Sequence, residues 1–271
     1  MTSLDPIALR DRYDVQLRAY LPDRLPPGAT VERDGPVLRV IGLDERGFVT
    51  YVSVADLPSD ELDALIARQR DRFAGRGEDV EWKLHGHDEP ADLPERLAAA
   101  GFVPDEVETV LIGLAAPLAD PAPPLPDGVR LREVTERPDL DRIEDLKVAV
   151  WGGDRAGLAA MLEGELAADP SALTVVVAEG GGEVVCAAWV RYVPGTPFAT
   201  LWGGATLPVW RGRGIYRALV AYRAWLAVSR GYTYLQVDAA PMSRPILQRY
   251  GFVAVTTTTP YVFTPLETTG G

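Results

Sequence analysis

Three arginines and two glycines alternate in the short segment Arg211–Arg217, which reads Arg-Gly-Arg-Gly-Ile-Tyr-Arg. An apolar pattern at helical spacing follows, and its predicted inner face consists of Ile215, Leu219, Tyr222, Trp225 and Leu226. The N-terminus of a helix presents unpaired N–H groups and a partial positive charge, so it attracts anions. Glycine has no Cβ and lets the backbone approach a ligand closely. We therefore expect this segment to bind a pyrophosphate group.

Two common phosphate-binding motifs do not fit these residues. A Walker loop needs Gly-Lys followed by Ser or Thr, which is absent here. The dinucleotide-binding fingerprint needs a third glycine at the position of Arg217. An ordinary strand-to-helix turn with solvated arginines remains the structural alternative.

The longer run over residues 206–219, Thr-Leu-Pro-Val-Trp-Arg-Gly-Arg-Gly-Ile-Tyr-Arg-Ala-Leu, resembles the acetyl-CoA loop of the GCN5-related N-acetyltransferase (GNAT) family. The pattern of that family is Gln/Arg-x-x-Gly-x-Gly/Ala after a strand and a short turn. Arg211 and Gly214 match its first two fixed positions, whereas Tyr216 replaces the last small residue. The resemblance implies an N-acetyltransferase that uses acetyl-CoA as co-substrate and needs no metal.

The same resemblance implies which residues hold the donor. The backbone of Gly204, Ala205 and Thr206 should hydrogen-bond the pantetheine arm like an added strand. Gly203-Gly204 lies where the strand of the family tends to bulge, and glycine suits a bulge. The pyrophosphate should be bound by Arg211, Gly212, Arg213, Gly214, Ile215, Tyr216 and Arg217.

The catalytic residues are harder to assign. Direct transfer to an amine needs a base for the ammonium and an acid for the leaving thiolate. Many members of the family supply the acid as a tyrosine of the last helix, where this chain has Leu247. The candidates that remain are Tyr216 near the donor, Asp238 at a strand end, and Tyr250. The alternative interpretation of Asp238 is a turn residue without a catalytic role. The alternative interpretation of Tyr250 is a side chain that packs in the core.

Aromatic residues supply a candidate acceptor site. Trp151, Asp154, Trp189, Tyr192 and Trp202 fall where the resemblance implies an acceptor pocket. An aromatic lining with one carboxylate would suit an amine. The alternative is that the tryptophans belong to the core and the aspartate is solvated.

The elements that position these residues read as a mixed α/β fold. In the second half we expect strands at 129–134, 173–178, 183–193, 198–207, 234–237 and 253–264, with helices at 139–151, 155–168, 215–230 and 244–250. The order β-α-α-β-β-β-α-β-α-β predicts a central mixed sheet flanked by helices, as in the GNAT fold. In the first half we expect strands at 37–41, 48–53, 80–85 and 106–114 and helices at 60–73 and 93–100.

A proline-rich stretch divides the chain. Residues 117–127 hold five prolines and read as a stiff, extended linker between a domain at 1–116 and a domain at 128–271. Segments 82–102 and 235–252 share a weak strand–helix–Gly-Phe repeat. We therefore expect a tandem protein with a degenerate N-terminal copy, which either covers the acceptor cleft or forms a homodimer surface.

Composition excludes several partners. The net charge is −12 and the isoelectric point about 4.7, which disfavours nucleic acid and anionic membrane surfaces. Cys186 is the only cysteine and no signal-peptide core is present, so we expect a cytoplasmic protein. His85-Gly86-His87-Asp88 looks like a metal cluster, but these are the only histidines, and we expect no metal site.

Two rival functions stay open. The leucine at position 247 favours a non-catalytic acyl-CoA-binding or sensing protein. A purely structural protein is the third reading. Our main expectation is an acetyl-CoA-dependent acetyltransferase that acts on an amine of a small molecule or peptide.

Overall fold

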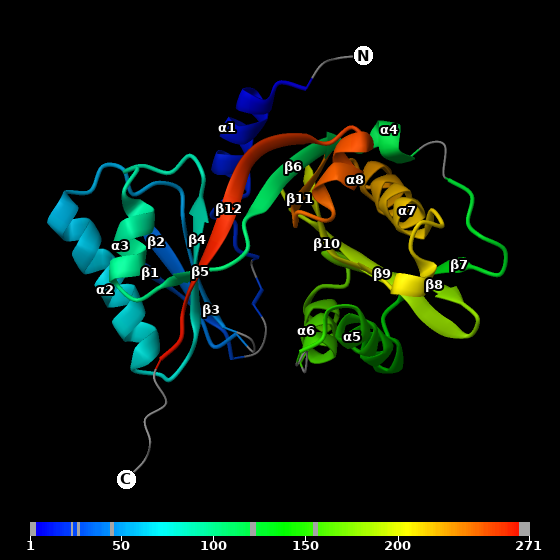
Figure 1. The fold of residues 1–271 in the computed structure, drawn as a ribbon, viewed down its shortest axis with the longest axis horizontal. Coiled ribbons are helices and arrows are strands. Elements are labelled where there is room, and N and C mark those ends of the chain that lie inside the picture. Colours follow the sequence, from blue (N-terminus) through cyan, green and yellow to red (C-terminus); the bar gives the residue numbers. More distant parts are fainter. Residues whose placement is uncertain are drawn as a thin grey trace, which may run out of the picture. The chain divides into compact units, whose positions relative to one another are not determined.

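The computed structural model describes residues 4–22, 24–25, 28–43, 46–119, 123–153 and 157–265. The chain divides into two compact units (Figure 1). The first unit comprises Met1–Leu111, Asp238–Arg249 and Val253–Gly271, and the second comprises Ile112–Val237 and Tyr250–Phe252.

The first unit is built on strands in the order β1-β2-β3-β4-β12, with β5 paired to β12. Helices α2 and α3 lie on one face of these strands (Figure 1) and bury Leu65, Phe73 and Leu97 with Trp82 in one core. The elements are α1 (Pro6–Gln16), β1 (Thr30–Asp34), β2 (Val37–Ile41), β3 (Gly47–Tyr51), α2 (Ser59–Ala74), β4 (Val80–His85), α3 (Leu93–Ala99), β5 (Val103–Pro104), α8 (Arg244–Arg249) and β12 (Val253–Phe263). Strand β6 (Glu108–Leu114) leads from this unit into the second.

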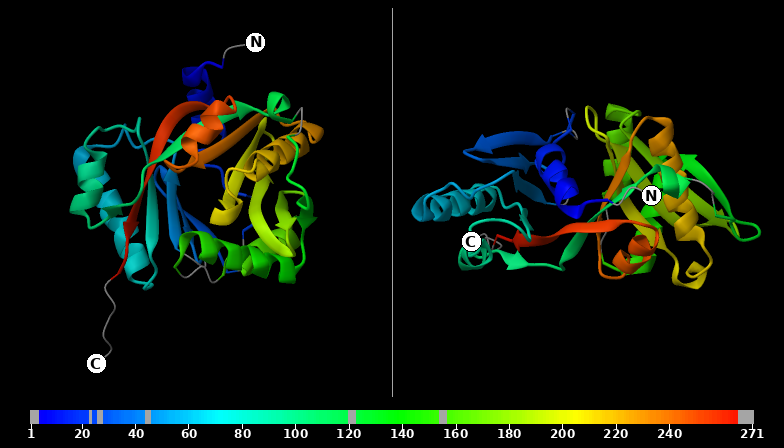
Figure 2. Two further views of the ribbon diagram at one scale, coloured as in Figure 1. Left: turned by 45° about the vertical axis from the view of Figure 1, so that its right-hand side comes forward. Right: turned by 90° about the horizontal axis from the view of Figure 1, so that it is seen from above.

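The second unit has the strand order β11-β10-β9-β8-β7, in which only the β10–β11 pairing is parallel. Helices α5 and α6 lie on one face of the strands and α7 on the other (Figure 2). The elements are α4 (Ala116–Ala119), β7 (Arg130–Val134), α5 (Arg137–Trp151), α6 (Leu158–Ala168), β8 (Leu173–Gly180), β9 (Glu183–Tyr192), β10 (Phe198–Thr206), the 3-10 turn η1 (Pro208–Trp210), α7 (Ile215–Ser229) and β11 (Tyr234–Ala239).

The mixed α/β prediction is confirmed, and the elements of the second unit lie close to their predicted positions. Runs of β-branched and small apolar residues form β8, β9 and β10; β8 and β9 are almost fully buried, and β10 is buried over residues 198–201. The turn between β8 and β9 has Gly181 at φ +62° and Gly182 at φ +86°, a conformation that favours glycine. The apolar runs and the glycine turn between them were therefore enough to predict these strands from the sequence.

The boundary between the units differs from the expected one. Asp238–Arg249 and Val253–Gly271 were predicted to belong to the second half, but they fall in the first unit. The physical reason is that β12 pairs antiparallel with β4, from Thr258 opposite His85 to Phe263 opposite Val80. The predicted linker also begins differently, because α4 forms a short helix at its start.

The predicted internal repeat has a counterpart in element order. Strand β4 is followed by α3 and β5, and β11 is followed by α8 and β12. Common descent of the two units from one tandem fold stays a prediction. No helix in the described part of the chain has the length and apolar character needed to cross a lipid bilayer.

Candidate functional site

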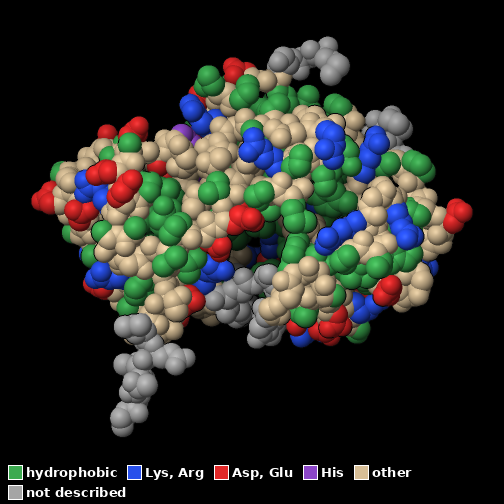
Figure 3. Space-filling model, viewed as in Figure 1, with side chains coloured by type: hydrophobic (Ala, Val, Ile, Leu, Met, Phe, Trp, Pro, Cys, Tyr) green, Lys and Arg blue, Asp and Glu red, His purple; other side chains and the backbone are tan. Residues whose placement is uncertain are grey.

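Helix α7 begins as the sequence predicts, directly after Gly214, which has φ +81°. No side chain caps this helix, and its first turn contains no acidic residue. Arg211, Arg213 and Arg217 are all exposed around it. Figure 3 shows Lys and Arg side chains gathered on the surface over α7 and the loop before it. The helix start therefore combines a dipole with exposed positive charge, as an anion site requires.

Each of these arginines has a neighbour that orients it. Arg211 Nε donates to the Thr206 carbonyl at 3.1 Å. The guanidinium of Arg213 lies 5.0 Å from the ring centre of Trp210, and that of Arg217 lies 5.6 Å from the ring centre of Tyr250. Within the described ranges no carboxylate forms an ion pair with the three arginines, so the charge remains available to an anion.

Strand β10 has a bulge at the expected position. Its register against β9 shifts between Trp202 and Ala205, and Gly203 within the shift has φ +65°. The parallel pairing with β11 covers only Phe198–Thr200 against Tyr234–Gln236. Residues 201–206 of β10 thus run on without β11 beside them, and such an edge can bind an extended ligand chain. Gly204, Ala205 and Thr206 lie on this edge, and their contact with the pantetheine arm stays a prediction.

Tyr216 lies against this edge. A methyl group on Gly204 would come within 2.7 Å of Tyr216 Cε2 and 3.4 Å of its hydroxyl oxygen. Glycine at 204 is therefore needed for the tyrosine ring to pack on the strand. The family pattern has a small residue at the position of Tyr216, and here the ring fills that space.

Two buried cations that the sequence analysis missed hold the bulge. Lys147 Nζ donates to the Gly203 carbonyl. Arg223 of α7 donates through one guanidinium nitrogen to the carbonyls of Trp189 at 3.1 Å and Trp202 at 3.4 Å. The apolar pattern had placed Tyr222 and Trp225 on the inner face of α7, but Trp225 is 51 % exposed and Arg223 is 1 % exposed. The sequence pattern did not predict the burial of Arg223, because a charged residue is normally expected on the solvent face of a helix.

The structure brings three of the predicted acceptor residues together. Trp189 and Trp202 are direct cross-strand partners on β9 and β10. Lys147 Nζ lies 4.5 Å from the ring centre of Trp151 and 5.1 Å from that of Trp189. Arg191 lies 4.8 Å from the Trp202 ring and is bonded to the Glu165 carboxylate. The indole faces thus already contact cations of the chain itself.

The other predicted acceptor residues are placed differently. Tyr192 hydrogen-bonds Thr174 at 3.2 Å and has Arg230 over its ring, so it belongs to a separate cluster. Asp154 lies outside the described residues. Trp151 and Trp202 are 50 % and 43 % exposed, so they are surface residues and not the core residues of the alternative reading.

The three catalytic candidates do not form one cluster. Tyr250 lies beside the α7 loop through its contact with Arg217. Asp238 belongs to the first unit, where it forms an ion pair with the partly buried Lys83 of β4. Leu247 is fully buried, as its apolar side chain suggests. The described contacts place Tyr216 and Tyr250 at the loop, and a catalytic role for any of the three residues stays a prediction.

The histidines and the cysteine have internal partners. His85 Nε2 hydrogen-bonds the Tyr13 hydroxyl, and His87 contacts Asp14 and Thr256. No group of three or more potential ligands among the described residues is arranged to hold a metal ion. The thiol of Cys186 is buried, which raises its pKa to about 11, so it is protonated and a weak nucleophile.

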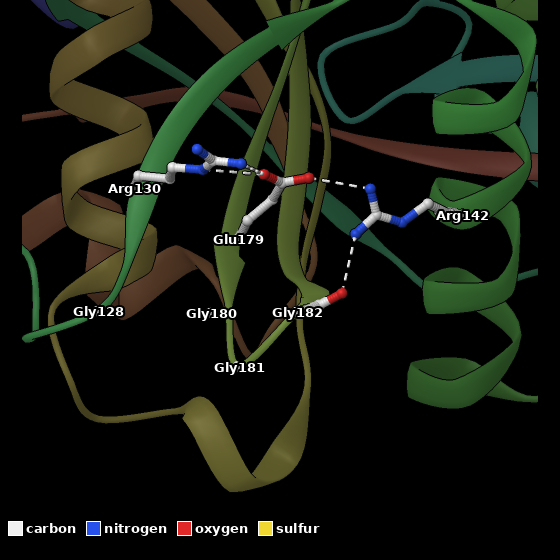
Figure 4. Close-up of a pocket in the computed structure, with 7 residues that line it drawn as sticks. All are labelled: Gly128, Arg130, Arg142, Glu179, Gly180, Gly181 and Gly182. Carbon is white, nitrogen blue, oxygen red and sulfur yellow. Dashed lines mark hydrogen bonds and ion pairs between the residues drawn. The ribbon is translucent and has the colours of Figure 1, made fainter.

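A surface pocket of about 390 Å³ lies where β7, α5 and the β8–β9 turn meet (Figure 4). Its arginines are bound to carboxylates, because Arg130 and Arg142 both donate to Glu179. Arg132 and Arg142 hold the pKa of Glu179 at about 2 by hydrogen bonding. The pocket is lined by Gly128, Arg130, Arg142, Glu179, Gly180, Gly181 and Gly182. Both of its arginines are paired with the same carboxylate, whereas those of the α7 loop form no ion pair in the described residues.

In the first unit, the matching strand edge is already filled. Strands β3 and β4 also run parallel over three residue pairs, ending at Val49 and Trp82. Directly beyond them Arg18 Nε donates to the Tyr51 carbonyl at 2.9 Å, and Thr50 Oγ1 donates to the Arg18 carbonyl at 2.7 Å. The chain segment after α1 therefore occupies the edge.

The following helix also lacks the features of α7. Helix α2 begins after Pro58 and has Asp60 and Glu61 in its first turn. Carboxylates at a helix N-terminus repel phosphate and compete for its N–H groups. The features that favour an anion are thus found at α7 of the second unit and not at α2 of the first.

Comparisons with known proteins gave matches only among solved structures. No family model matches the chain, and no curated protein matches it. A GCN5-related N-acetyltransferase from Kribbella flavida is 14 % identical, with a TM-score of 0.68 over 100 % of this chain and 98 % of that one. A tandem GNAT protein from the clavulanic acid biosynthesis pathway is 15 % identical, with a TM-score of 0.61 over 88 % and 84 % of the two chains.

A functionally unknown protein from Staphylococcus epidermidis shares the architecture as well. It is 14 % identical, with a TM-score of 0.63, and the match covers 90 % of this chain and 97 % of that one. At such identities structural similarity establishes a common fold, while activity must be argued from the site. The chain has the fold of the GCN5-related N-acetyltransferases.

Proposed function

We propose that this protein is an N-acetyltransferase that transfers the acetyl group of acetyl-CoA directly to an amine of a small molecule or peptide. The observation that carries the proposal is the coincidence of an anion site and an open strand edge. The uncapped start of α7 lies directly after Gly214, and residues 201–206 of β10 run on without β11 beside them. A donor with a pyrophosphate and an amide-containing arm matches both features.

The tryptophan cluster supports an acceptor site on the surface of β9 and β10. Trp151 and Trp202 are half-exposed beside Trp189, and Lys147 and Arg191 lie against the indole rings. Arg191 is paired with Glu165, so the cluster also holds a carboxylate. An aromatic surface with a carboxylate beside it suits an amine acceptor.

The direct test measures free thiol release from acetyl-CoA in the presence of a panel of primary amines and lysine-containing peptides. The proposal predicts amine-dependent release and an acetylated product of matching mass. Release that does not depend on any amine, or no release from a protein that binds acetyl-CoA, contradicts it.

A non-catalytic acyl-CoA sensor is the second candidate. The observation in its favour is Leu247, a fully buried apolar residue at the position where many members of the family have the acidic tyrosine. Binding of acetyl-CoA without turnover across the panel would support the sensor. A ligand that binds the native state and not the unfolded state raises the stability of the protein. If acetyl-CoA does not raise the melting temperature, neither the acetyltransferase nor the sensor is supported.

A further inference from the structure

Arg223 is a buried cation without a carboxylate partner in the described parts of the chain. Its residue exposure is 1 %, and its hydrogen-bond acceptors are the carbonyls of Leu219, Trp189 and Trp202. A buried charge is costly unless ion pairs or hydrogen bonds compensate for it. A methionine could fill the same space at lower cost, so the retained charge calls for an explanation.

Part of that explanation is the bulge. The register of β10 against β9 breaks after the pair Trp202–Trp189, and both carbonyls of this pair accept from the same Arg223 nitrogen. The guanidinium therefore clamps the two strands at the last regular pair before the open edge. This contact fixes where Gly204 and the following residues lie.

The other part is the phenol of Tyr216. Its ring packs on Gly204, directly after the bulge, so the contact that fixes the bulge also fixes where the phenol lies. Arg223 and Tyr216 stand two helical turns apart on α7, and the positive charge of Arg223 acts to lower the pKa of the phenol. The hydroxyl also lies at the open edge, next to Gly204.

We propose that Arg223 is a positioning residue that fixes the β10 bulge and orients the Tyr216 hydroxyl to protonate the thiolate leaving acetyl-CoA. This inference rests on the proposed function. The amine nitrogen bonds to the thioester carbonyl carbon, the carbon–sulfur bond breaks, and its electron pair goes to sulfur. The sulfur takes the phenol proton, and the phenolate remains beside the guanidinium. The new amide nitrogen loses its extra proton to water, and water returns one to the phenolate.

The electrostatics agree with this arrangement. Burial raises the pKa of Tyr216, so its hydroxyl is protonated at neutral pH and can act as an acid. The positive charge of Arg223 opposes that rise, which makes the phenolate accessible during turnover. Burial likewise lowers the pKa of Arg223. The sequence thus compensates for its missing tyrosine at 247 with one on α7.

The test combines kinetics with a titration of the phenol. Tyr216→Phe, Arg223→Lys and Arg223→Met are compared with Tyr222→Phe, a matched control on the same helix whose hydroxyl donates to Glu133. We expect Tyr216→Phe to lower kcat by about 100-fold or more, as for loss of a general acid, with a smaller change in KM for acetyl-CoA. Arg223→Met should lower kcat similarly, Arg223→Lys should recover part of it, and Tyr222→Phe should leave it unchanged.

The titration separates this role from a merely structural one. With ¹³C-labelled tyrosine, NMR follows the Tyr216 phenol, whose signal is assigned by its loss in Tyr216→Phe. Arg223→Met should raise its pKa and Arg223→Lys should raise it less. If Tyr216→Phe keeps wild-type kcat, or if neither Arg223 variant shifts the titration, the proposal is overturned. If no amine supports turnover by the wild type, the proposed function and the proton transfer fail together, while the titration still decides whether Arg223 acts on the Tyr216 phenol.

Discussion

Gly203 shows how strongly the neighbours of a single residue can restrict it. Its φ is +65°, and a methyl group on its Cα would lie 2.0 Å from Trp189 Cζ3. Gly181 has almost the same φ, +62°, but nothing within 4 Å of such a methyl group. The two glycines form a matched pair that separates backbone strain from steric conflict.

We expect Gly203→Ala to be much more destabilising than Gly181→Ala. The backbone strain alone costs about 1–2 kcal/mol in either variant. Overpacking against Trp189 adds about 1–3 kcal/mol for Gly203→Ala. Urea denaturation measures both free energies of unfolding. Equal losses in the two variants would show that Trp189 does not restrict the bulge.

Glu108 gives a pH-dependent prediction. Burial raises its pKa from 4.5 to about 7, helped by Asp238 and Glu81 and opposed by Lys83. The folded state therefore binds a proton that the unfolded state releases, and this contribution to stability falls as the pH rises from about 4.5 to about 7. Glu108→Gln should remove that slope, so its stability relative to wild type should increase between pH 5 and pH 8. A pH-independent difference in melting temperature would contradict the assignment.

At the α7 loop the sequence signal was local. The helix start after Gly214 could be predicted because the loop and the helix are contiguous in sequence. Arg223 and Lys147 could not, because their role depends on carbonyls of β9 and β10 that only the folded sheet brings near. The tryptophans of the predicted acceptor site were singled out by their residue type, but the cations that lie against their rings were not predicted.

At the scale of elements, the second unit was largely readable from sequence. Apolar runs bounded by glycine and proline turns predicted β8, β9 and β10, and helical spacing predicted α7. The partner of β12 could not be predicted, because the pairing between β4 and β12 joins segments about 180 residues apart in the chain. Helix α1 was missed because its face toward the core is short, with only Leu9 and Tyr13 buried.

The β4–β12 pairing predicts how fragments behave. A fragment of residues 1–119 lacks β12, so the β4 edge and the core residue Tyr261 lose their partners. We expect this fragment to aggregate or melt without cooperativity when expressed alone. Co-expression with residues 120–271 should give a soluble complex that co-purifies and melts cooperatively. A cooperative, monomeric melt of the short fragment by itself would contradict the assignment of β12 to the first unit.

At the scale of the whole molecule, the two units differ in their capacity to bind a donor. The second unit has an open β10 edge and an uncapped basic helix start. In the first unit, Arg18 and Thr50 close the corresponding edge, and α2 starts with Asp60 and Glu61. We therefore expect one acyl-CoA site per chain, with the first unit serving another purpose.

Isothermal titration calorimetry with acetyl-CoA tests the central claim most directly. The variants are Gly214→Val in the loop and Gly231→Val at the opposite end of α7, where φ is +85° and nothing lies within 4 Å of an added methyl group. Both introduce the same backbone strain. We predict one site per chain for the wild type and Gly231→Val, and affinity at least about 10-fold weaker for Gly214→Val, a loss of about 1.4 kcal/mol. Two sites per chain, or wild-type affinity in a folded Gly214→Val protein, would contradict the account.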